Sequence, residues 1–162
     1  MSLKSQEVRA IAPEMDPLRM GMGWKVEDLE KPQIMVESTF GDSHPGSAHL
    51  MGFVEEAVRG IYEHGGKGAR YFATDICDGM AQGHDGINYS LASRDTIANM
   101  IEIHANATTF DAGVFVASCD KAVPAQSDGT FIGGLQKAIS SSSDYSFFCS
   151  GRVLGSYFGR YR

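Results

Sequence analysis

The chain has 162 residues, close to one domain on the rough prior of about 150 residues per domain. Hydrophobic residues make up 43% of it and charged residues 21%, so the composition excludes a disordered chain, a collagen-like fibre and a small disulfide-rich scaffold. Its 14 Lys and Arg against 20 Asp and Glu give a net charge of −6. This argues against a nucleic-acid binder, because such a protein needs cations that displace counterions from phosphates.

Hydrophobic periods alternate between strand-like and helix-like along the first 125 residues. Strands are predicted over 33–38, 70–76 and 113–118. Helices are predicted over 53–61, ending at Gly65-Gly66, and over 93–105, beginning at a Ser93 cap. The order β-α-β-α-β predicts an α/β fold, a partial doubly wound parallel sheet with helices packed on its faces.

The chain lacks sequence signals for a membrane or an oxidising compartment. No stretch approaches the roughly 20 apolar residues of a membrane span, and residues 1–9 lack the apolar core of a signal peptide. We therefore expect a cytoplasmic protein with no membrane partner. In that compartment the three cysteines, Cys77, Cys119 and Cys149, are metal ligands, nucleophiles or core residues rather than disulfides.

Polar, glycine-rich segments follow each of the three predicted strands. They cover residues 39–49, 77–90 and 119–125. The carboxyl ends of parallel strands lie at one edge of a sheet, where ligands collect in folds of this class. We expect the three segments to meet there and form one site.

Two of these segments begin with the same dipeptide, Cys77-Asp78 and Cys119-Asp120. A thiolate is a soft ligand suited to iron–sulfur clusters or zinc, whereas a carboxylate is a hard ligand suited to magnesium or manganese. The pairs therefore predict a metal site, with packing cysteines and turn-forming aspartates as the alternative. The segments also carry three histidines, His44, His49 and His84. These are ligands, acid–base groups or simply hydrogen-bonded loop side chains.

Several motifs together give the sequence a family resemblance. They are Lys31-Pro32-Gln33-Ile34, Cys77-Asp78-Gly79 with Gln82-Gly83-x-x-Gly86, Ser90-Leu91-x-Ser93-Arg94, and Cys119-Asp120-Lys121-x-x-Pro124-Ala125. Over residues of about 20–125 the chain resembles the amino-terminal part of the dihydroxy-acid dehydratase and 6-phosphogluconate dehydratase family. The resemblance implies an amino-terminal fragment of a larger dehydratase domain, whose full-length form is a homodimer.

The activity implied by the resemblance is that of a hydro-lyase. Such an enzyme removes water from a small-molecule 2,3-dihydroxy acid to give a 2-keto acid, as in branched-chain amino acid biosynthesis, with a sugar-acid dehydratase as the alternative. The implied cofactors are Mg²⁺ and an iron–sulfur cluster, either 2Fe-2S or 4Fe-4S. Cys77 and Cys119 correspond to cluster ligands, Asp78 and Asp120 to magnesium ligands, and Lys121 to a catalytic lysine that is carbamylated and bridges to the metal. The candidates for a substrate loop are Ser47, His49 and His84.

Residues 126–162 differ in composition from residues 1–125. They carry a net charge of +2 against −8, and they contain eight serines. Family members usually continue with His-Leu-Met-Ala after Ala125, where this chain reads Gln-Ser-Asp-Gly. Codons exist for Gln-Ser-Asp-Gly from which deletion of one base, the third base of the Gln codon, gives a reading frame that encodes His-Leu-Met-Ala. We therefore expect an atypical, frameshifted or truncated tail, and little or no activity of the short chain alone. A non-catalytic metal-binding module or remnant is the alternative from another class.

Overall fold

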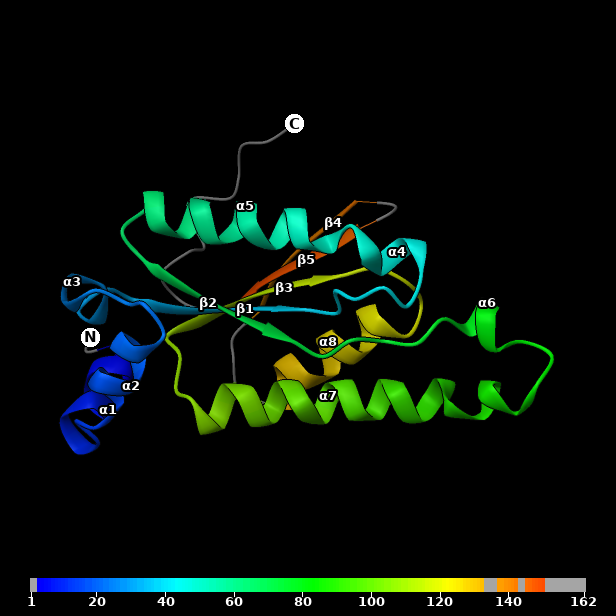
Figure 1. Cartoon of the computed structure of the whole chain (residues 1–162), viewed down its shortest axis with the longest axis horizontal. Coiled ribbons are helices and arrows are strands. Elements are labelled where there is room, and N and C mark those ends of the chain that lie inside the picture. The colour runs from blue at the N-terminus through cyan, green and yellow to red at the C-terminus, as the bar shows by residue number, and fades with distance from the viewer. Residues whose placement is uncertain (1–2, 133–136, 143–144, 151–162) are drawn as a thin grey trace.

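The computed structural model describes residues 3–132, 137–142 and 145–150 (Figure 1). Before the second strand its elements are α1 (Lys4–Ile11), α2 (Met15–Gly21), α3 (Val26–Leu29), β1 (Gln33–Ser38), α4 (Pro45–Ala48) and α5 (Leu50–Glu63). They continue with β2 (Lys67–Phe72), α6 (Asp78–Ala81), the 3₁₀ turn η1 (Asp85–Asn88), α7 (Tyr89–Ala107) and β3 (Ala112–Ala117). After β3 come α8 (Ala122–Ile132), β4 (Lys137–Ser142) and β5 (Tyr145–Ser150).

The sheet has the strand order β2-β1-β3-β5-β4. β1 lies between β2 and β3 and is parallel to both, and its register pairs Ile34 with Gly68 on one side and with Ala112 on the other. β5 pairs with β3 and β4 in antiparallel fashion. The predicted α/β class is confirmed, since the three predicted strands form the parallel part.

The two crossover helices cover opposite faces of this sheet. α5 connects β1 to β2 on one face, and α7 connects β2 to β3 on the other (Figure 1). The chain therefore winds in both directions from β1, and the strand order reverses between β1 and β3. In sheets of this kind the crevice at the carboxyl ends of the strands on either side of the reversal is the usual ligand site.

Residues of β1 alternate between two hydrophobic layers. Ile34 and Val36 pack toward α5, in a cluster that includes Leu50, Val54 and Ile61. Met35 packs toward α7, in a cluster that includes Ile97, Ile101, Phe110 and Phe115. All six residues of β1 are buried, and its apolar centre, Ile34-Met35-Val36, is the run that predicted this strand.

Two predicted boundaries are wrong. The second strand covers Lys67–Phe72 rather than 70–76, because its pairing starts opposite Gln33 and the Lys67 amide donates to the Pro32 carbonyl. This strand lies at the edge of the sheet. Its exposed Arg70 and Phe72 interrupt the hydrophobic pattern from which the bounds of a strand are predicted. The Ser93 hydroxyl does not cap a helix, since α7 begins at Tyr89 and Ser93 donates to the Ser90 carbonyl inside it.

The amino-terminal helices attach to the sheet through polar contacts. The backbone amide and the hydroxyl of Ser5 both donate to Asp111, the residue before β3. Asp28 accepts from the Lys31 and Lys67 ammonium groups. Burial alone would raise the pKa of Asp28, but these two ammonium groups hold it well below its usual range.

Helix α8 follows β3 and packs on α7. It covers Ala122–Ile132, so the predicted division at residue 125 falls inside this helix. The proposed frameshift stays a prediction, and residues 133–136, 143–144 and 151–162 of that tail lie outside the described residues. Within the described ranges, none of the helices is both long and apolar enough to cross a bilayer.

Candidate metal site

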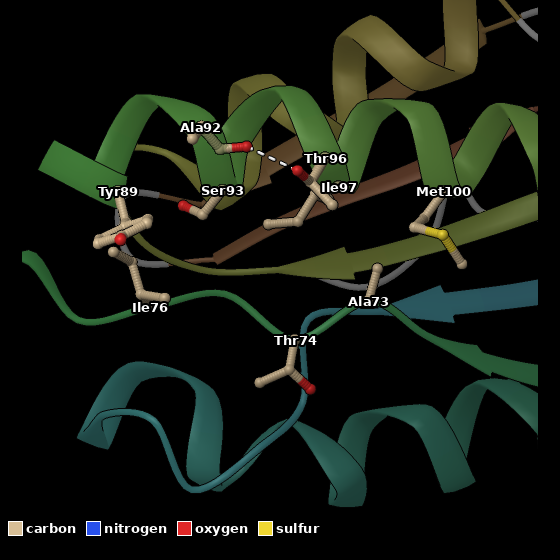
Figure 2. Close-up of a pocket in the computed structure, with 9 residues that line it drawn as sticks. All are labelled: Ala73, Thr74, Ile76, Tyr89, Ala92, Ser93, Thr96, Ile97 and Met100. Atoms are coloured by element: carbon tan, nitrogen blue, oxygen red, sulfur yellow. Dashed lines mark hydrogen bonds between the residues drawn. The ribbon is translucent and has the colours of Figure 1, made fainter. Parts of the chain in front are cut away.

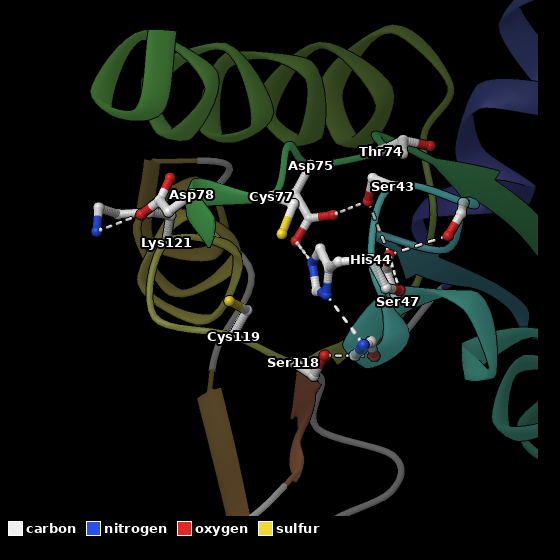
Figure 3. A network of polar contacts seen from close by, with 12 residues as sticks. Ser43, His44, Ser47, Thr74, Asp75, Cys77, Asp78, Ser118, Cys119 and Lys121 are labelled. Atoms are coloured by element: carbon white, nitrogen blue, oxygen red, sulfur yellow. Dashed lines mark hydrogen bonds and ion pairs between the residues drawn. The ribbon is translucent and has the colours of Figure 1, made fainter. Parts of the chain in front are cut away.

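The three polar segments lie at the carboxyl edge of the parallel strands, as predicted (Figure 3). Asp78 opens α6 after the second strand, and Lys121 lies directly before α8 after the third. Nζ of Lys121 lies 3.0 Å from Oδ2 of Asp78 and 2.7 Å from Oδ2 of Asp120. This lysine therefore joins two segments that are 42 residues apart in the sequence, and the two Cys-Asp pairs belong to one site.

The charged groups of this site shift the pKa values of one another so that each group stays ionised. The nearby Ser90 hydroxyl and the Lys121 ammonium lower the pKa of Asp78, and the same ammonium lowers that of Asp120. Hydrogen bonds to Asp120 and Asp78 in turn raise the pKa of Lys121. At neutral pH the carboxylates of Asp78 and Asp120 thus hold the Lys121 ammonium group between them. The same two carboxylates would stabilise a hard cation.

The two cysteines lie beside this charged group with free thiols. Cys77 is the N-cap of α6, and its sulfur accepts a hydrogen bond from the Met80 amide at 3.4 Å. Cys119 is exposed and has a φ of 78°, a left-handed conformation that is rare for a residue with a side chain. Partial burial is the main cause that raises the pKa of its thiol, and the charges of Asp120 and Asp75 add to it.

The donor set has the right chemistry for the implied cofactors but is incomplete. Oδ1 of Asp78 is shielded from solvent and receives no hydrogen bond of normal geometry from a described residue, although the Ser90 hydroxyl lies near this carboxyl. In the part of the chain that the structure describes, no three His, Cys, Asp or Glu side chains gather closely enough to hold a metal ion by themselves. The two thiols and two carboxylates thus fit a cluster and a hard cation as partial ligand sets.

The predicted substrate-loop residues make local contacts. Ser47 is buried and donates to the Gly41 carbonyl, and Nδ1 of the exposed His49 lies 2.9 Å from the Pro45 carbonyl. His84 is exposed and accepts from the Gly86 amide. A role in substrate binding stays a prediction for all three.

A buried pair that the motifs did not indicate lies next to the site. His44 was one of three candidate loop histidines, but its partner Asp75 was not singled out. Asp75 lies in the unpaired segment after β2 and carries no recognisable spacing to His44, 31 residues earlier. The tertiary structure alone brings the two together.

A hollow near this edge is lined mainly by apolar surface (Figure 2). It has a volume of about 440 Å³ and lies between α7 and the segment after β2. Its lining residues are Ala73, Thr74, Ile76, Tyr89, Ala92, Ser93, Thr96, Ile97 and Met100. It contains neither the cysteines nor the carboxylates, so it is separate from the candidate metal site.

The sequence matches known proteins over the region that builds this site. Residues 31–132 match the family model described as dihydroxy-acid/6-phosphogluconate dehydratase N-terminal. The chain is 43% identical over 107 residues to the dihydroxy-acid dehydratase of Methanococcus vannielii, which covers 66% of the chain and 20% of that protein. It is 42% identical over 125 residues to the dihydroxy-acid dehydratase of Desulfatibacillum aliphaticivorans, covering 75% of the chain and 22% of that protein.

The chain spans about a fifth of the length of the curated relatives it matches. The matched range of the family model extends from just before β1 through α8, and it contains both Cys-Asp pairs and Lys121. The chain therefore belongs to the dihydroxy-acid/6-phosphogluconate dehydratase family, of which it carries the amino-terminal region.

Proposed function

We propose that this chain provides the cofactor-binding edge of a hydro-lyase that converts a 2,3-dihydroxy acid to a 2-keto acid. The observation that supports it is the ion pair between Lys121 and Asp78, which unites the two Cys-Asp segments at the ligand edge of the sheet. Relatives named dihydroxy-acid dehydratase support the same reaction class. The site lies in the cytoplasm, and its ligand is a small molecule.

The residues have distinct roles in this proposal. Cys77 and Cys119 bind an iron–sulfur cluster, 2Fe-2S or 4Fe-4S, and Asp78 and Asp120 bind Mg²⁺. When bound, these groups supply Lewis-acid chemistry, which helps a hydroxyl leave and acidifies the neighbouring carbon. Lys121, once carbamylated, would add a further oxygen ligand for the magnesium. The protein itself orients the substrate and excludes water.

Lys121 must become neutral before it can be carbamylated. In the metal-free site, Asp78 and Asp120 keep it charged, because both accept its hydrogen bonds and raise its pKa. Neutralising the two carboxylates removes that effect. Carbamylation would add CO₂ to the neutral Nζ of Lys121 with release of one proton, so it would be favoured once the two carboxylates no longer hold the ammonium group.

The substrate is a branched-chain dihydroxy acid in our first assignment and a sugar acid in the second. Ser47, His49 and His84 are proposed to belong to the loops that bind it. Since the chain spans about a fifth of its relatives, we propose that it has little activity alone and that a full-length form acts as a homodimer.

Anaerobic reconstitution with iron and sulfide tests the proposed ligands. We expect the wild-type chain to acquire iron, sulfide and a visible absorption band, and Cys77→Ser or Cys119→Ser to reduce the bound iron at least tenfold. Cys149→Ser is the matched control and should keep the band. A wild-type chain that binds no iron, or that binds zinc alone in metal analysis, would instead favour the non-catalytic module.

A chimera tests the reaction itself. Residues 31–125 replace the aligned segment of the Methanococcus vannielii dehydratase, and 2-keto acid formation is measured with a branched-chain dihydroxy acid and with a sugar acid. A change in substrate preference relative to the unaltered Methanococcus vannielii dehydratase would identify the branch of the family. A chimera that binds the cluster but forms no 2-keto acid from either substrate would contradict the dehydratase assignment.

A further inference from the structure

A buried polar network lies beside the two cysteine-bearing segments (Figure 3). Nε2 of His44 lies 2.8 Å from Oδ2 of Asp75, and the two residues are 7% and 4% exposed. The Ser43 hydroxyl donates to the other carboxylate oxygen at 2.8 Å. Burying these polar groups costs free energy unless each of them forms a hydrogen bond. The positions of the two side chains are therefore fixed by their hydrogen-bond partners.

The hydrogen bonds assign the proton on the imidazole. The Gly46 amide donates to Nδ1 of His44 at 3.0 Å, so Nδ1 carries no proton. The ring proton is therefore on Nε2, which donates it to Asp75. This directional chain runs from Gly46 through His44 to Asp75, and it links the segment after β1 to the segment after β2.

The same glycine links the segment after β1 to the segment after β3. The Ser118 hydroxyl donates to the Gly46 carbonyl, and Ser118 is 4% exposed. A Cβ at position 46 would lie 2.8 Å from both Cε1 of His44 and Oγ of Ser118. Gly46 thus has no room for a side chain, because the histidine and the serine close on it from two sides.

We propose that His44, Gly46, Asp75 and Ser118 form a loop brace that sets the relative positions of Cys77 and Cys119. Asp75 lies two residues before Cys77, and Ser118 lies directly before Cys119. The four are positioning residues, and they act through the backbone of the two segments. The identity of the group that the thiols bind rests on the proposed function, whereas the brace is measurable without any metal.

Asp75→Asn is the sharpest variant of the brace. Asparagine has one oxygen and one NH₂ group where aspartate has two acceptor oxygens, so either an NH₂ group meets Nε2–H of His44 or Ser43 must turn from donor to acceptor. His44 cannot adopt the other tautomer, with its proton on Nδ1, because Nδ1 accepts a hydrogen bond from the Gly46 amide. The expected result is a changed ¹⁵N spectrum of the His44 ring, because Nε2–H loses its charged acceptor in either orientation of the asparagine.

Thiol reactivity measures the position of each cysteine. In a Cys149→Ser background without metal, reaction rates with a disulfide reagent are followed at Cys77 and Cys119 by mass spectrometry. We expect Asp75→Asn to raise the rate at Cys77 at least threefold. Ser118→Ala removes one hydrogen bond without adding volume, so it should fold normally and raise the rate mainly at Cys119. His64→Gln, an exposed residue at the end of α5, is the control.

Reconstitution of the same variants separates the brace from the proposed function. If wild type binds the cluster, we expect both brace variants to bind less iron per chain than His64→Gln. If wild type binds none while the brace variants still change the thiol rates, the proposed function fails and the brace stands. Unchanged thiol rates and an unchanged His44 spectrum in Asp75→Asn and Ser118→Ala would overturn the brace.

Discussion

Glu37→Gln should raise the free energy of unfolding relative to wild type, and this difference should increase by about 2 kcal/mol between pH 5 and pH 8. Glu37 lies in the middle of β1 and is fully buried on the α7 face. Oε2 lies 2.9 Å from Nδ1 of His104, whereas Oε1 is buried with no hydrogen bond from a described residue. Burial raises the pKa of this carboxyl from 4.5 to about 7, although His104 opposes the shift.

The sign follows from proton binding in the two states. Between the unfolded pKa of 4.5 and the folded pKa of about 7, the folded protein keeps a proton that the unfolded chain has lost. The stability contributed by Glu37 is therefore complete below pH 4.5 and disappears as the pH rises through about 7. Glutamine is neutral throughout and can still donate to Nδ1 of His104, so it avoids this loss.

Urea unfolding of wild type and variant at pH 5, 6, 7 and 8 measures the effect. The pH dependence that comes from other groups, such as Asp28, is common to both proteins and cancels in the difference. Glu7→Gln is the control, because Glu7 is exposed on α1, and its curve should run parallel to that of wild type. Parallel curves for Glu37→Gln and wild type would contradict the prediction.

Gly129→Ala should lower the free energy of unfolding by about 1–3 kcal/mol, the usual cost of overpacking. Gly129 lies in α8 where this helix contacts α7. A Cβ there would lie 2.8 Å from the Ala98 carbonyl oxygen and 2.8 Å from Cβ of Ile101. The carbonyl belongs to the backbone of α7, so the clash cannot be relieved by rotating a side chain.

Gly52→Ala is the matched substitution in a helix. Gly52 lies in α5, and no atom lies within 4 Å of the position that its Cβ would occupy. Alanine should therefore stabilise the protein by about 0.5–1 kcal/mol through its better helix propensity. Urea unfolding compares the two variants. If Gly129→Ala is as stable as Gly52→Ala, residues 122–132 do not pack on α7 as described.

The sequence predicted those parts of the fold that have a strong local signal. β1 was predicted at its observed bounds, because its apolar centre, Ile34-Met35-Val36, lies in a segment of strand length. β2 was displaced, because an edge strand with exposed Arg70 and Phe72 shows no such run. The start of α7 was also missed, because its first turn follows η1 directly and Ser93 imitates a cap.

The candidate site was predicted by composition and by order along the chain. Two Cys-Asp pairs, each after a strand of a parallel sheet, were expected at one edge, and the ion pair of Lys121 with Asp78 now joins them. The proton arrangement on His44 was not predictable, since it depends on Asp75 and Gly46 approaching one ring from different segments. Likewise, nothing local indicates that Glu37 meets His104 across 67 residues.

By itself, the sequence determined the α/β class, the order of the elements and the residue types available for metal chemistry, because these depend on short-range periodicity and on side-chain chemistry. Only the tertiary structure decided which polar groups are buried together, such as His44 with Asp75 and Glu37 with His104. The physical reason is that burial and hydrogen-bond partners are properties of the packed sheet and its helices. They arise between residues tens of positions apart, where no spacing rule operates.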